Sequence, residues 1–551
     1  MPTAIPRRLD LDRAAVRHGL ALVVALAALL LRLWRIDRQP LWFDEAMTTH
    51  IVHAPDGLDY VHNTPPLYYW LLRAFTDWSG IGAAGLRSLS AVAGAGFVWA
   101  SFHAARCAFG NRAALPTALL AFACPIHLYY SQEARAYSLL LFELMVALWM
   151  LWRLTGQVRF GSWIVLVVAS AAALHTHYLA AIPLALAHVV IGLSAPAAVR
   201  RTVAMAVAAA GVIAALLLLP WVLWWSQRNP VESNDMRWLA LLWSQLSVAG
   251  AFSSSTELLL LGGQAGRTPI FLKQFTSLPF ADAARIAALM AMGLLLALFM
   301  VRMRHATSWR RLITIHCLVM FVGPLVGLWA LSFARPIYCP GRYDLIALPG
   351  FVLLLGGAIS SAFDARGTAT KWLAGLAVVV IAAVLAAKDW CYFAAVPAPD
   401  PSHAVATQLA ANVQPGETVV LCGAVGVPVL AQLYQDGFVW SDRTCRSARS
   451  NVEFGCRLLP PSLEAAPATI TRYLRALEDG SLAAELERML PVIAGPGIWL
   501  VLGEDLRTGG RDAAMEAVAR RLFGVLHDAG YEIAGGEPAL GVAHLRLRSG
   551  R

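Results

Sequence analysis

The sequence predicts a polytopic α-helical membrane protein of about eleven transmembrane helices, followed by a soluble α/β domain. Three observations lead to this prediction. The 551 residues are 58% hydrophobic with a mean hydropathy of +0.60, only 14% are charged, and long apolar runs recur along the first 390 residues. A soluble domain usually has about 25% charged residues. The apolar surface must therefore face lipid as well as a protein core.

The expected spans are runs close to the roughly 20 apolar residues that a helix needs to cross a bilayer. They are 19–36, 84–105, 113–130, 136–153, 160–176, 178–194, 202–225, 283–301, 312–332, 343–361 and 372–390. Four arginines precede the first run, as in a signal peptide, but no small-x-small cleavage site follows it. An uncleaved first helix is therefore expected.

Basic residues indicate the orientation of the chain. With the N-terminus in the cytoplasm, most connections rich in arginine fall on the cytoplasmic side, as the positive-inside rule requires. The net charge of +10 fits this topology better than nucleic-acid binding, because the basic residues stand singly or in pairs between apolar runs. We expect a multi-pass protein of the inner (cytoplasmic) membrane with an external C-terminus and no nucleic-acid partner.

Two long segments, 37–83 and 226–282, are expected on the outer face, where loops on a rigid scaffold often carry function. The membrane domain is assigned to 1–390. Residues 391–551 are assigned to a periplasmic α/β domain after a proline-rich linker. Its expected strands are 418–422, 498–502 and 540–547, and its expected helices are 470–490 and 513–529.

The C-terminal domain shows no Gly-rich phosphate loop and no obvious catalytic set, so no chemistry is assigned to it. The chain has eight cysteines but no CxxC pair, so a zinc site has little support. If the domain is periplasmic, Cys445 and Cys456 could form a disulfide.

The first candidate residues with chemistry are Asp44 and Glu45. They follow Trp42 and Phe43, aromatic residues that belong at a membrane interface and would hold the acidic pair near the headgroups. The alternative is an ordinary pair of solvated carboxylates. His62, just before a Pro-Pro pair, could orient a carboxylate or contact an anion, or be an ordinary loop residue.

Further candidates lie at the expected outer ends of later helices. Arg87 opens the second span and could bind a phosphate or simply extend toward the headgroups. The tight link between the third and fourth spans holds more polar groups than a turn needs. Those groups are Tyr130, Gln132, Glu133 and Arg135. The alternative is that Glu133 and Arg135 simply pair with each other.

His177 stands two residues after His175, so the two side chains would point to different faces of a helix and could not easily share a metal. A role as hydrogen-bonding residue is more plausible. Arg342 and Tyr343 open the tenth span, and an arginine fork there would suit the phosphate of a lipid carrier. The alternative is an Arg342–Asp344 pair or an arginine that reaches the headgroups.

Six short segments in this order resemble GT-C glycosyltransferases that use polyprenyl-phosphate sugars. The most similar groups are bacterial relatives of the protein O-mannosyltransferases and the lipid A aminoarabinose transferase, of the glycosyltransferase family 39 type. Each segment is short, but the six are in register over residues 20–360. They are 43–45, 65–69, 86–88, 129–135, 176–178 and 342–343.

The resemblance implies that Asp44 is the catalytic base and that Glu45 shapes the acceptor or phosphate site. It implies that Arg135 and Arg342 surround the carrier phosphate. The same cavity would be lined by His62, Arg87, Tyr130, Gln132, Glu133, His177 and Tyr343. Some members use a divalent metal, but Asp44, Glu45 and Glu133 alone make no clear ligand set, so the cofactor stays open.

The predicted function is transfer of a sugar from a polyprenyl-phosphate donor to a glycan, lipid or protein acceptor on the outer face, with inversion. The alternative is a polyprenyl-lipid transporter or flippase, which usually needs polar residues within the membrane and often has paired repeats. The expected helix interiors are nearly free of charge except for Glu143, and no repeat is evident. A non-catalytic assembly or receptor protein would leave the polar outer turns unexplained.

Overall fold

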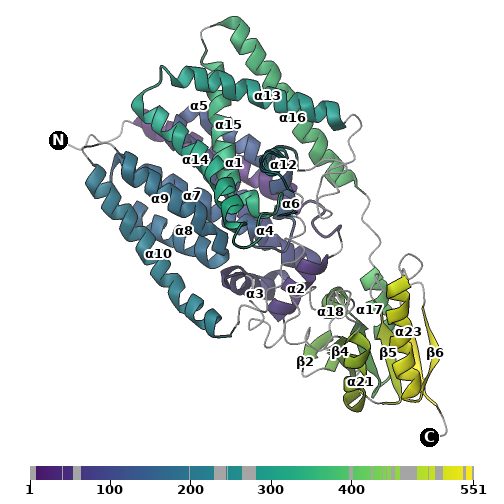
Figure 1. Ribbon diagram of the computed structural model, residues 1–551. Coiled ribbons are helices and arrows are strands. Elements are labelled where there is room, and N and C mark those ends of the chain that lie inside the picture. Colours follow the sequence, from purple (N-terminus) through teal and green to yellow (C-terminus); the bar gives the residue numbers. More distant parts are fainter. Residues whose placement is uncertain are drawn as a thin grey trace. The chain divides into compact units, whose positions relative to one another are not determined.

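The computed structural model forms two compact units, which are described separately below (Figure 1). The helical unit comprises Met1–Ile36, Arg87–Trp224 and Trp238–Val396, and the mixed unit comprises Asp37–Leu86, Trp225–Arg237 and Pro397–Arg551. The structure describes residues 8–551 except 40, 54–63, 196, 198, 229–242, 245, 263–280, 366, 396–400, 423–425, 437, 442–443, 448–452, 460–480, 494, 503–512, 538–541 and 549–551.

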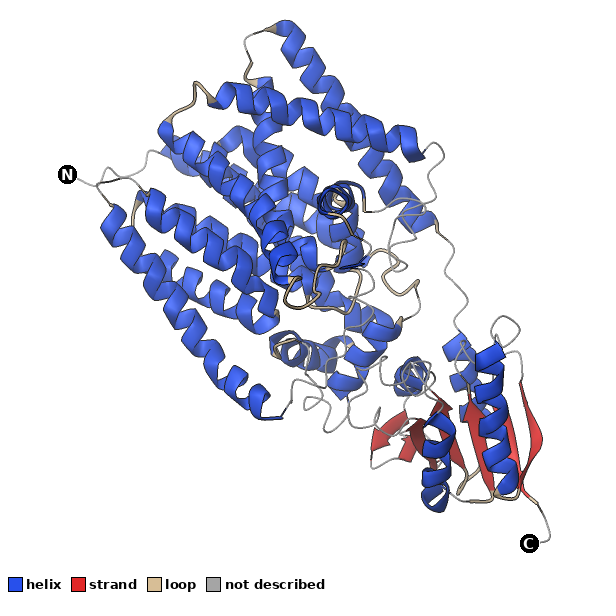
Figure 2. Cartoon of the chain, in the orientation of Figure 1, coloured by secondary structure: helices blue, strands red, loops and turns tan. Residues whose placement is uncertain are grey.

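The helical unit is built almost entirely of helices (Figure 2). In chain order its elements are α1 (Arg8–Leu33), α4 (Ala83–Phe109), α5 (Asn111–Phe122), α6 (Pro125–Ser131), α7 (Tyr137–Gly156), α8 (Phe160–Thr176), η2 (Tyr178–Ala180), α9 (Ala181–Ser194), α10 (Arg200–Arg228), α12 (Val248–Leu261), α13 (Ala281–Met303), α14 (Ser308–Leu331), η5 (Tyr343–Ala347), α15 (Leu348–Phe363) and α16 (Thr368–Ala394).

The predicted polytopic helical membrane fold with a small C-terminal α/β part is confirmed. Among the described residues, seven helices are long and apolar enough to cross a membrane, and the bent pair α5–α6 makes an eighth if it counts as one span. Two of the predicted runs, 160–176 and 178–194, coincide with helical segments shorter than 18 residues, and the run 113–130 is divided between α5 and α6. The count of about eleven spans therefore stays a prediction.

The run 113–130 was expected as one helix, but α5 and α6 meet at an angle of 61°. Pro125 explains the break, because proline lacks the backbone N–H and disfavours helical geometry in the residue before it. The guanidinium of Arg32 compensates for part of the break. Its Nη2 donates to the carbonyls of Ala121 and Phe122 at 3.4 Å each, and its Nε donates to Ser131 at 3.1 Å.

Glu143 is not the main charged residue inside the helices, contrary to expectation. Lys388 and Asp389, which the expected run 372–390 already contains, lie within α16 rather than at its end because the helix continues to Ala394, and the side chain of Lys388 is buried. The apolar pattern of the run 372–390 did not single out these two residues, because both stand near its end. Helix α15 is the most buried of the apolar spans and forms the centre of the unit.

The mixed unit contains a seven-stranded sheet with helices (Figure 2). Its elements are α2 (Phe43–His53), α3 (Leu67–Ser79), α17 (Pro401–Asn412), β1 (Thr418–Cys422), α18 (Gly426–Gln435), β2 (Phe438–Ser441), β3 (Thr444–Ser447), β4 (Glu453–Leu459), α21 (Ser481–Ile493), β5 (Gly497–Val501), α23 (Ala513–Asp528), β6 (Tyr531–Glu537) and β7 (Val542–Leu547).

The strand order is β2-β3-β4-β1-β5-β7-β6. Strand β1 is parallel to both of its neighbours, β4 and β5, while the outer pairs are antiparallel. The central strands β1 and β5 are buried throughout, as their continuous apolar runs predict. The helix expected over 470–490 is described only from Ser481, and residues 470–480 lie outside the described part.

The candidate disulfide is not formed in the structure. Cys445 and Cys456 are buried free thiols on the neighbouring antiparallel strands β3 and β4. Burial raises the pKa of the Cys445 thiol well above its ordinary value, and the neighbouring Cys456 acts in the same direction. Both thiols therefore pack as small apolar side chains.

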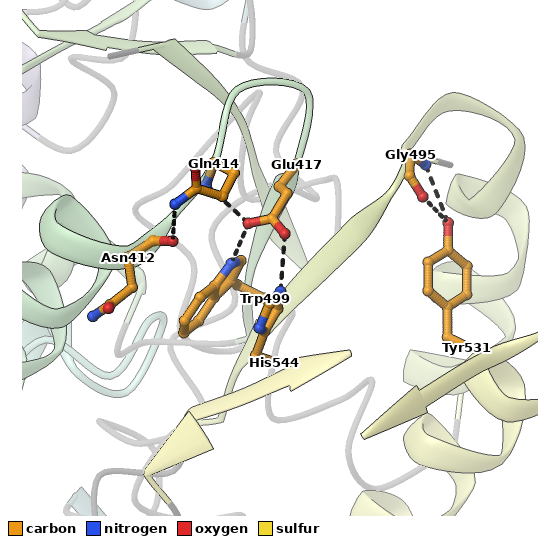
Figure 3. Close-up of polar contacts among 7 residues, drawn as sticks. All are labelled: Asn412, Gln414, Glu417, Gly495, Trp499, Tyr531 and His544. Carbon is orange, nitrogen blue, oxygen red and sulfur yellow. Dashed lines mark hydrogen bonds and ion pairs between the residues drawn. The ribbon is translucent and has the colours of Figure 1, made fainter. Parts of the chain in front are cut away.

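A buried carboxylate joins three strands of this sheet (Figure 3). Glu417 accepts hydrogen bonds from Trp499 Nε1 at 2.7 Å, from His544 Nε2 at 2.9 Å and from the backbone N–H of Gln414 at 2.9 Å. The Trp499 and His544 rings stack with centroids 4.2 Å apart. Burial raises the pKa of Glu417, but the three hydrogen bonds outweigh it and the pKa lies below its usual value.

The segment 37–83, expected as an external loop, contains two helices that belong to the mixed unit. Helix α2 packs against α18, with Ala46 and Met47 in a small apolar cluster with Ala431. Tyr434 Oη and His50 Nδ1 lie 3.3 Å apart. The helix that begins with the acidic pair is thus held by the C-terminal part of the chain.

Candidate functional site

Four parts of the helical unit contribute to one group of polar side chains, which we call the tyrosine–arginine cluster. Its members are Tyr130, Tyr137, His177, Arg342 and Tyr343. They come from α6, the start of α7, the turn between α8 and η2, and the start of η5. Apolar helices position all of them, so side chains distant in the sequence share one site.

Arg342 is the charged centre of this cluster. Its Nε donates to Tyr137 Oη at 2.7 Å, and its guanidinium carbon lies 5.6 Å from the centroid of the Tyr343 ring. Tyr130 Oη donates to the carbonyl of Gly341 at 2.7 Å. Gly341 has φ +78°, a left-handed conformation that favours glycine. The turn before Arg342 is therefore fixed by its own backbone and by α6.

His177 completes the cluster as a neutral hydrogen-bonding group. Its Nδ1 accepts from the backbone N–H of Leu179 at 3.2 Å, which leaves the proton on Nε2 in the assigned tautomer. Burial lowers the pKa of His177 to about 3, and the positive charges of Arg135 and Arg342 act in the same direction. At neutral pH this imidazole is therefore an uncharged donor beside two cations.

Two of the predicted substrate-binding residues, Arg87 and Gln132, contact the chain at and just beyond the end of α1. Arg87 Nη1 donates to the carbonyl of Ile36 at 2.7 Å. Gln132 Nε2 donates to the carbonyls of Arg32 and Trp34 at 2.8 and 2.9 Å. Both side chains are buried. These contacts fix the segment that follows α1, and the predicted role of the two residues in substrate binding stays a prediction.

Glu133 and Arg135 occupy the short turn between α6 and α7. The Glu133 side chain is buried and hydrogen-bonded to Tyr129. Arg135 is half-buried, close enough to His177 to influence its charge, and its carbonyl accepts from Ser90 Oγ at 3.1 Å. The turn thus brings Arg135 toward the same cluster as Arg342.

Two contributors were missed from the sequence. Tyr137 ends the polar link that the sequence singles out, but only the structure shows its contact with Arg342. Arg32 looked like an arginine at the end of the first span, yet it is fully buried. A signal for Arg32 was available, because an arginine followed by more apolar residues needs internal acceptors.

The acidic pair lies in the mixed unit, at the start of α2. Asp44 is half-buried and Glu45 is fully buried. Both stand in the first helical turn, where the helix dipole favours a negative charge. Thr48 and Thr49 donate back to the carbonyls of Asp44 and Glu45 at 2.9 and 3.0 Å. His62 lies outside the described residues.

The described part of the chain contains no group of three or more His, Cys, Asp or Glu side chains arranged to hold a metal ion.

Comparisons with known proteins support the predicted resemblance to GT-C glycosyltransferases. Residues 63–224 match the family described as dolichyl-phosphate-mannose-protein mannosyltransferase. No curated protein is similar enough in sequence to match the chain. The predicted resemblance to this superfamily is confirmed, and the prediction of a membrane glycosyltransferase is confirmed at this level of class.

Solved structures support the same class. The chain is similar to ArnT from Cupriavidus metallidurans bound to undecaprenyl phosphate, with a TM-score of 0.56 and 14% identity over 97% of this chain and 98% of that one. The apo state of the same protein gives a TM-score of 0.57 and 13% identity over the same shares of both chains. At these identities the likeness establishes the fold.

Proposed function

We propose that the protein transfers a sugar from a polyprenyl-phosphate donor to an acceptor at the outer face of the cytoplasmic membrane. The observation that carries this proposal is the tyrosine–arginine cluster, in which Arg342 is fixed by Tyr137 and flanked by His177 and Arg135. The ArnT structure bound to undecaprenyl phosphate has the same fold. A phosphate on a long lipid is the ligand that such a cationic site in a membrane domain would suit.

The leaving group of this reaction is a lipid phosphate, whose departure requires stabilisation of negative charge. Arg342 presents a planar fork that can contact two phosphate oxygens, and the bond from its Nε to Tyr137 Oη fixes the orientation of that fork. Arg135 adds a second positive charge. His177 can donate from Nε2 without repelling the cations, because its pKa of about 3 keeps it neutral. Fixed donors of this kind stabilise developing charge well.

Asp44 is proposed as the general base for the acceptor. The acceptor hydroxyl attacks the anomeric carbon, the bond from that carbon to the phosphate oxygen breaks, and the lipid phosphate leaves with the bonding electrons. The acceptor proton passes to the Asp44 carboxylate. A positioned base contributes roughly 10²–10⁴ in rate. One base and one cationic group suit a single displacement with inversion, since a double displacement would require a nucleophilic carboxylate.

Glu45 is assigned to positioning rather than proton transfer. Its side chain is buried, whereas that of Asp44 is half-exposed on the same helical turn. The partners of the reaction would be a polyprenyl-phosphate-linked sugar, a glycan, lipid or protein acceptor, and the bilayer. In this proposal the N-terminus is cytoplasmic and the α/β part is periplasmic.

Two variants test the proposal by separating binding from transfer. Arg342→Gln in the purified full-length protein should weaken retention of radiolabelled undecaprenyl phosphate at least about tenfold, because a charge-assisted contact is worth roughly 1.5–3 kcal/mol. Asp44→Asn should leave that retention unchanged. Cells carrying Asp44→Asn should accumulate one polyprenyl-phosphate sugar, which mass spectrometry of the lipid extract would identify. Normal transfer by Asp44→Asn would overturn the assignment of the base.

A polyprenyl-lipid transporter remains the second candidate because of one observation inside the helical unit. Glu143 is buried on α7 and accepts from Thr176 at 3.2 Å through one oxygen, while its other oxygen has no hydrogen-bond partner among the described residues. Buried ionisable groups of this kind occur in transport pathways. Translocation of undecaprenyl phosphate in proteoliposomes that is lost in Glu143→Gln, without sugar transfer, would favour this candidate.

A further inference from the structure

A second polar cluster lies at the end of the helical unit opposite the tyrosine–arginine cluster. It is formed where α1 begins and where α4 and α7 end, whereas the candidate site uses the end of α1 and the starts of α4 and α7. Arg87 and Arg106 mark the two ends of α4. Nineteen helical rises of about 1.5 Å separate them by about 28 Å, close to the thickness of a bilayer core.

His103 on α4 is the centre of this second cluster. Its side chain is 1% exposed and its ring lies between aromatic neighbours, with centroids 4.7 Å from Trp99 and 5.0 Å from Trp149, on which it stacks. The His18 ring of α1 lies 5.1 Å away. This packing accounts for an aromatic ring at position 103 but not for its nitrogens.

Both ring nitrogens of His103 lack a hydrogen-bond partner among the described residues. A buried donor left unpaired costs about 1–3 kcal/mol, and a phenylalanine would fill the same space without that cost. The charged or titratable groups closest to His103 electrostatically are Arg106, His18 and Arg153. The two unpaired nitrogens of His103 therefore lie within electrostatic range of Arg106 and Arg153.

Three arginines from three helices lie near one another at this end of the helical unit. Arg106 of α4 lies within electrostatic range of Arg17 on α1 and Arg153 on α7. The guanidinium carbon of Arg153 is 5.9 Å from the Trp149 ring, and Arg17 Nε is buried without a partner in the described part of the chain. None of the three arginines forms an ion pair with a described residue. The topology rule explains arginines at this end, but not a buried imidazole with unpaired nitrogens among them.

We propose that Arg17, Arg106, Arg153 and His103 bind the phosphate of an anionic phospholipid in the leaflet opposite the candidate site. An arginine fork matches phosphate oxygens, and the imidazole N–H supplies a further donor. A lipid suits the position because α1 presents exposed apolar side chains beside Arg17. Val16, Leu20 and Val23, at helical spacing, are 72%, 41% and 62% exposed. The headgroup would neutralise the three cations and hold α1, α4 and α7 together.

The test measures the melting temperature of the purified full-length protein in detergent micelles with added dioleoylphosphatidylglycerol, dioleoylphosphatidylcholine or inorganic phosphate. Phosphatidylglycerol should raise the melting temperature by several degrees more than phosphatidylcholine. Arg106→Gln/Arg153→Gln should lose most of this increment. The control Arg201→Gln/Arg304→Gln, which removes two exposed arginines elsewhere in the helical unit, should keep it.

His103→Phe separates a lipid site from simple core packing. It should preserve or raise the melting temperature without added lipid, because it removes unpaired nitrogens from an aromatic pocket, and it should lose part of the phosphatidylglycerol increment. Equal increments in the wild type, in Arg106→Gln/Arg153→Gln and in His103→Phe would overturn the proposal. An equal effect of inorganic phosphate would overturn the lipid assignment and identify the site as one for free phosphate.

Discussion

The hydroxyl of Tyr434 on α18 lies 3.3 Å from His50 Nδ1 on α2 and joins the C-terminal domain to the helix of the acidic pair. Next to this contact, Ala431 packs against Ala46 and Met47, the two residues that follow Glu45. The C-terminal domain has no catalytic set of its own in the sequence. We infer that its contact with α2 positions Asp44, the proposed base.

Enlarging Ala431 tests this positioning role. Ala431→Leu should displace α2, because overpacking a close contact costs about 1–3 kcal/mol. Sugar transfer should fall several-fold while retention of undecaprenyl phosphate stays unchanged, since the residues proposed to bind the phosphate belong to the helical unit. Gln432→Leu is the matched control on the next, half-exposed position of α18. Equal transfer by both variants would show that the contact does not govern the acidic pair.

The contact between Arg342 and Tyr137 predicts that lysine cannot replace arginine at position 342. A lysine keeps the charge but loses the planar fork and the bond from Nε to Tyr137 Oη. Arg342→Lys should weaken undecaprenyl phosphate retention roughly tenfold, by about 1.4 kcal/mol. Arg335→Lys, at an exposed arginine of the same connection, should bind normally. Full retention by Arg342→Lys would mean that charge alone is recognised.

Arg32 is expected to be essential for the bend between α5 and α6. Its guanidinium supplies donors to Ala121, Phe122 and Ser131, which one ammonium group could not contact together. Arg32→Lys should lower stability by at least about 2 kcal/mol, because buried carbonyls lose their partners. The readout is the melting temperature of the full-length protein in detergent. Arg35→Lys, at a more exposed arginine nearby, is the control and should cause a much smaller shift.

The sequence predicts the membrane class and helix positions well, because apolar runs determine both. Its predictions of β1 as 418–422 and of α23 from residue 513 agree with the structure. The break at Pro125, the burial of Arg32 and the contact of α2 with α18 depend on partners distant in the chain, which periodicity cannot show. The catalytic roles of Asp44 and Arg342 rest on the resemblance and remain proposals.

His177 predicts a loss of stability at acidic pH. Its pKa is about 3 in the fold and about 6.5 in an unfolded chain, so the unfolded state binds more protons between these values. Stability is retained above about pH 6.5 and falls as the pH drops toward 3, by at most about 1.4 kcal/mol per pH unit from this residue. His177→Gln should flatten the dependence of melting temperature on pH between 6.5 and 4.5. His403→Gln, at an exposed histidine, should leave the slope unchanged.

Glu417, a carboxylate next to β1, makes the C-terminal sheet sensitive to acid. Its pKa lies below the usual value because three hydrogen bonds outweigh burial, so its stabilising effect is present above the ordinary carboxyl pKa and is lost as the pH falls through the folded one (Figure 3). Glu417→Gln places an amide against the Trp499 and His544 donors and should cost about 1–3 kcal/mol at pH 7.

Hydrogen exchange of the peptide covering β5 in the full-length protein measures this cost locally. Exchange should be faster in Glu417→Gln than in the wild type at pH 7, and the difference should shrink as the pH of the exchange reaction is lowered through the folded pKa of Glu417. Glu532→Gln removes a largely exposed carboxylate that lies 3.8 Å from Arg548 and should leave β5 exchange unchanged. An equal acceleration in both variants would indicate a general effect of lost charge. Of the two carboxylates, only Glu417 accepts buried hydrogen bonds from β5 and β7.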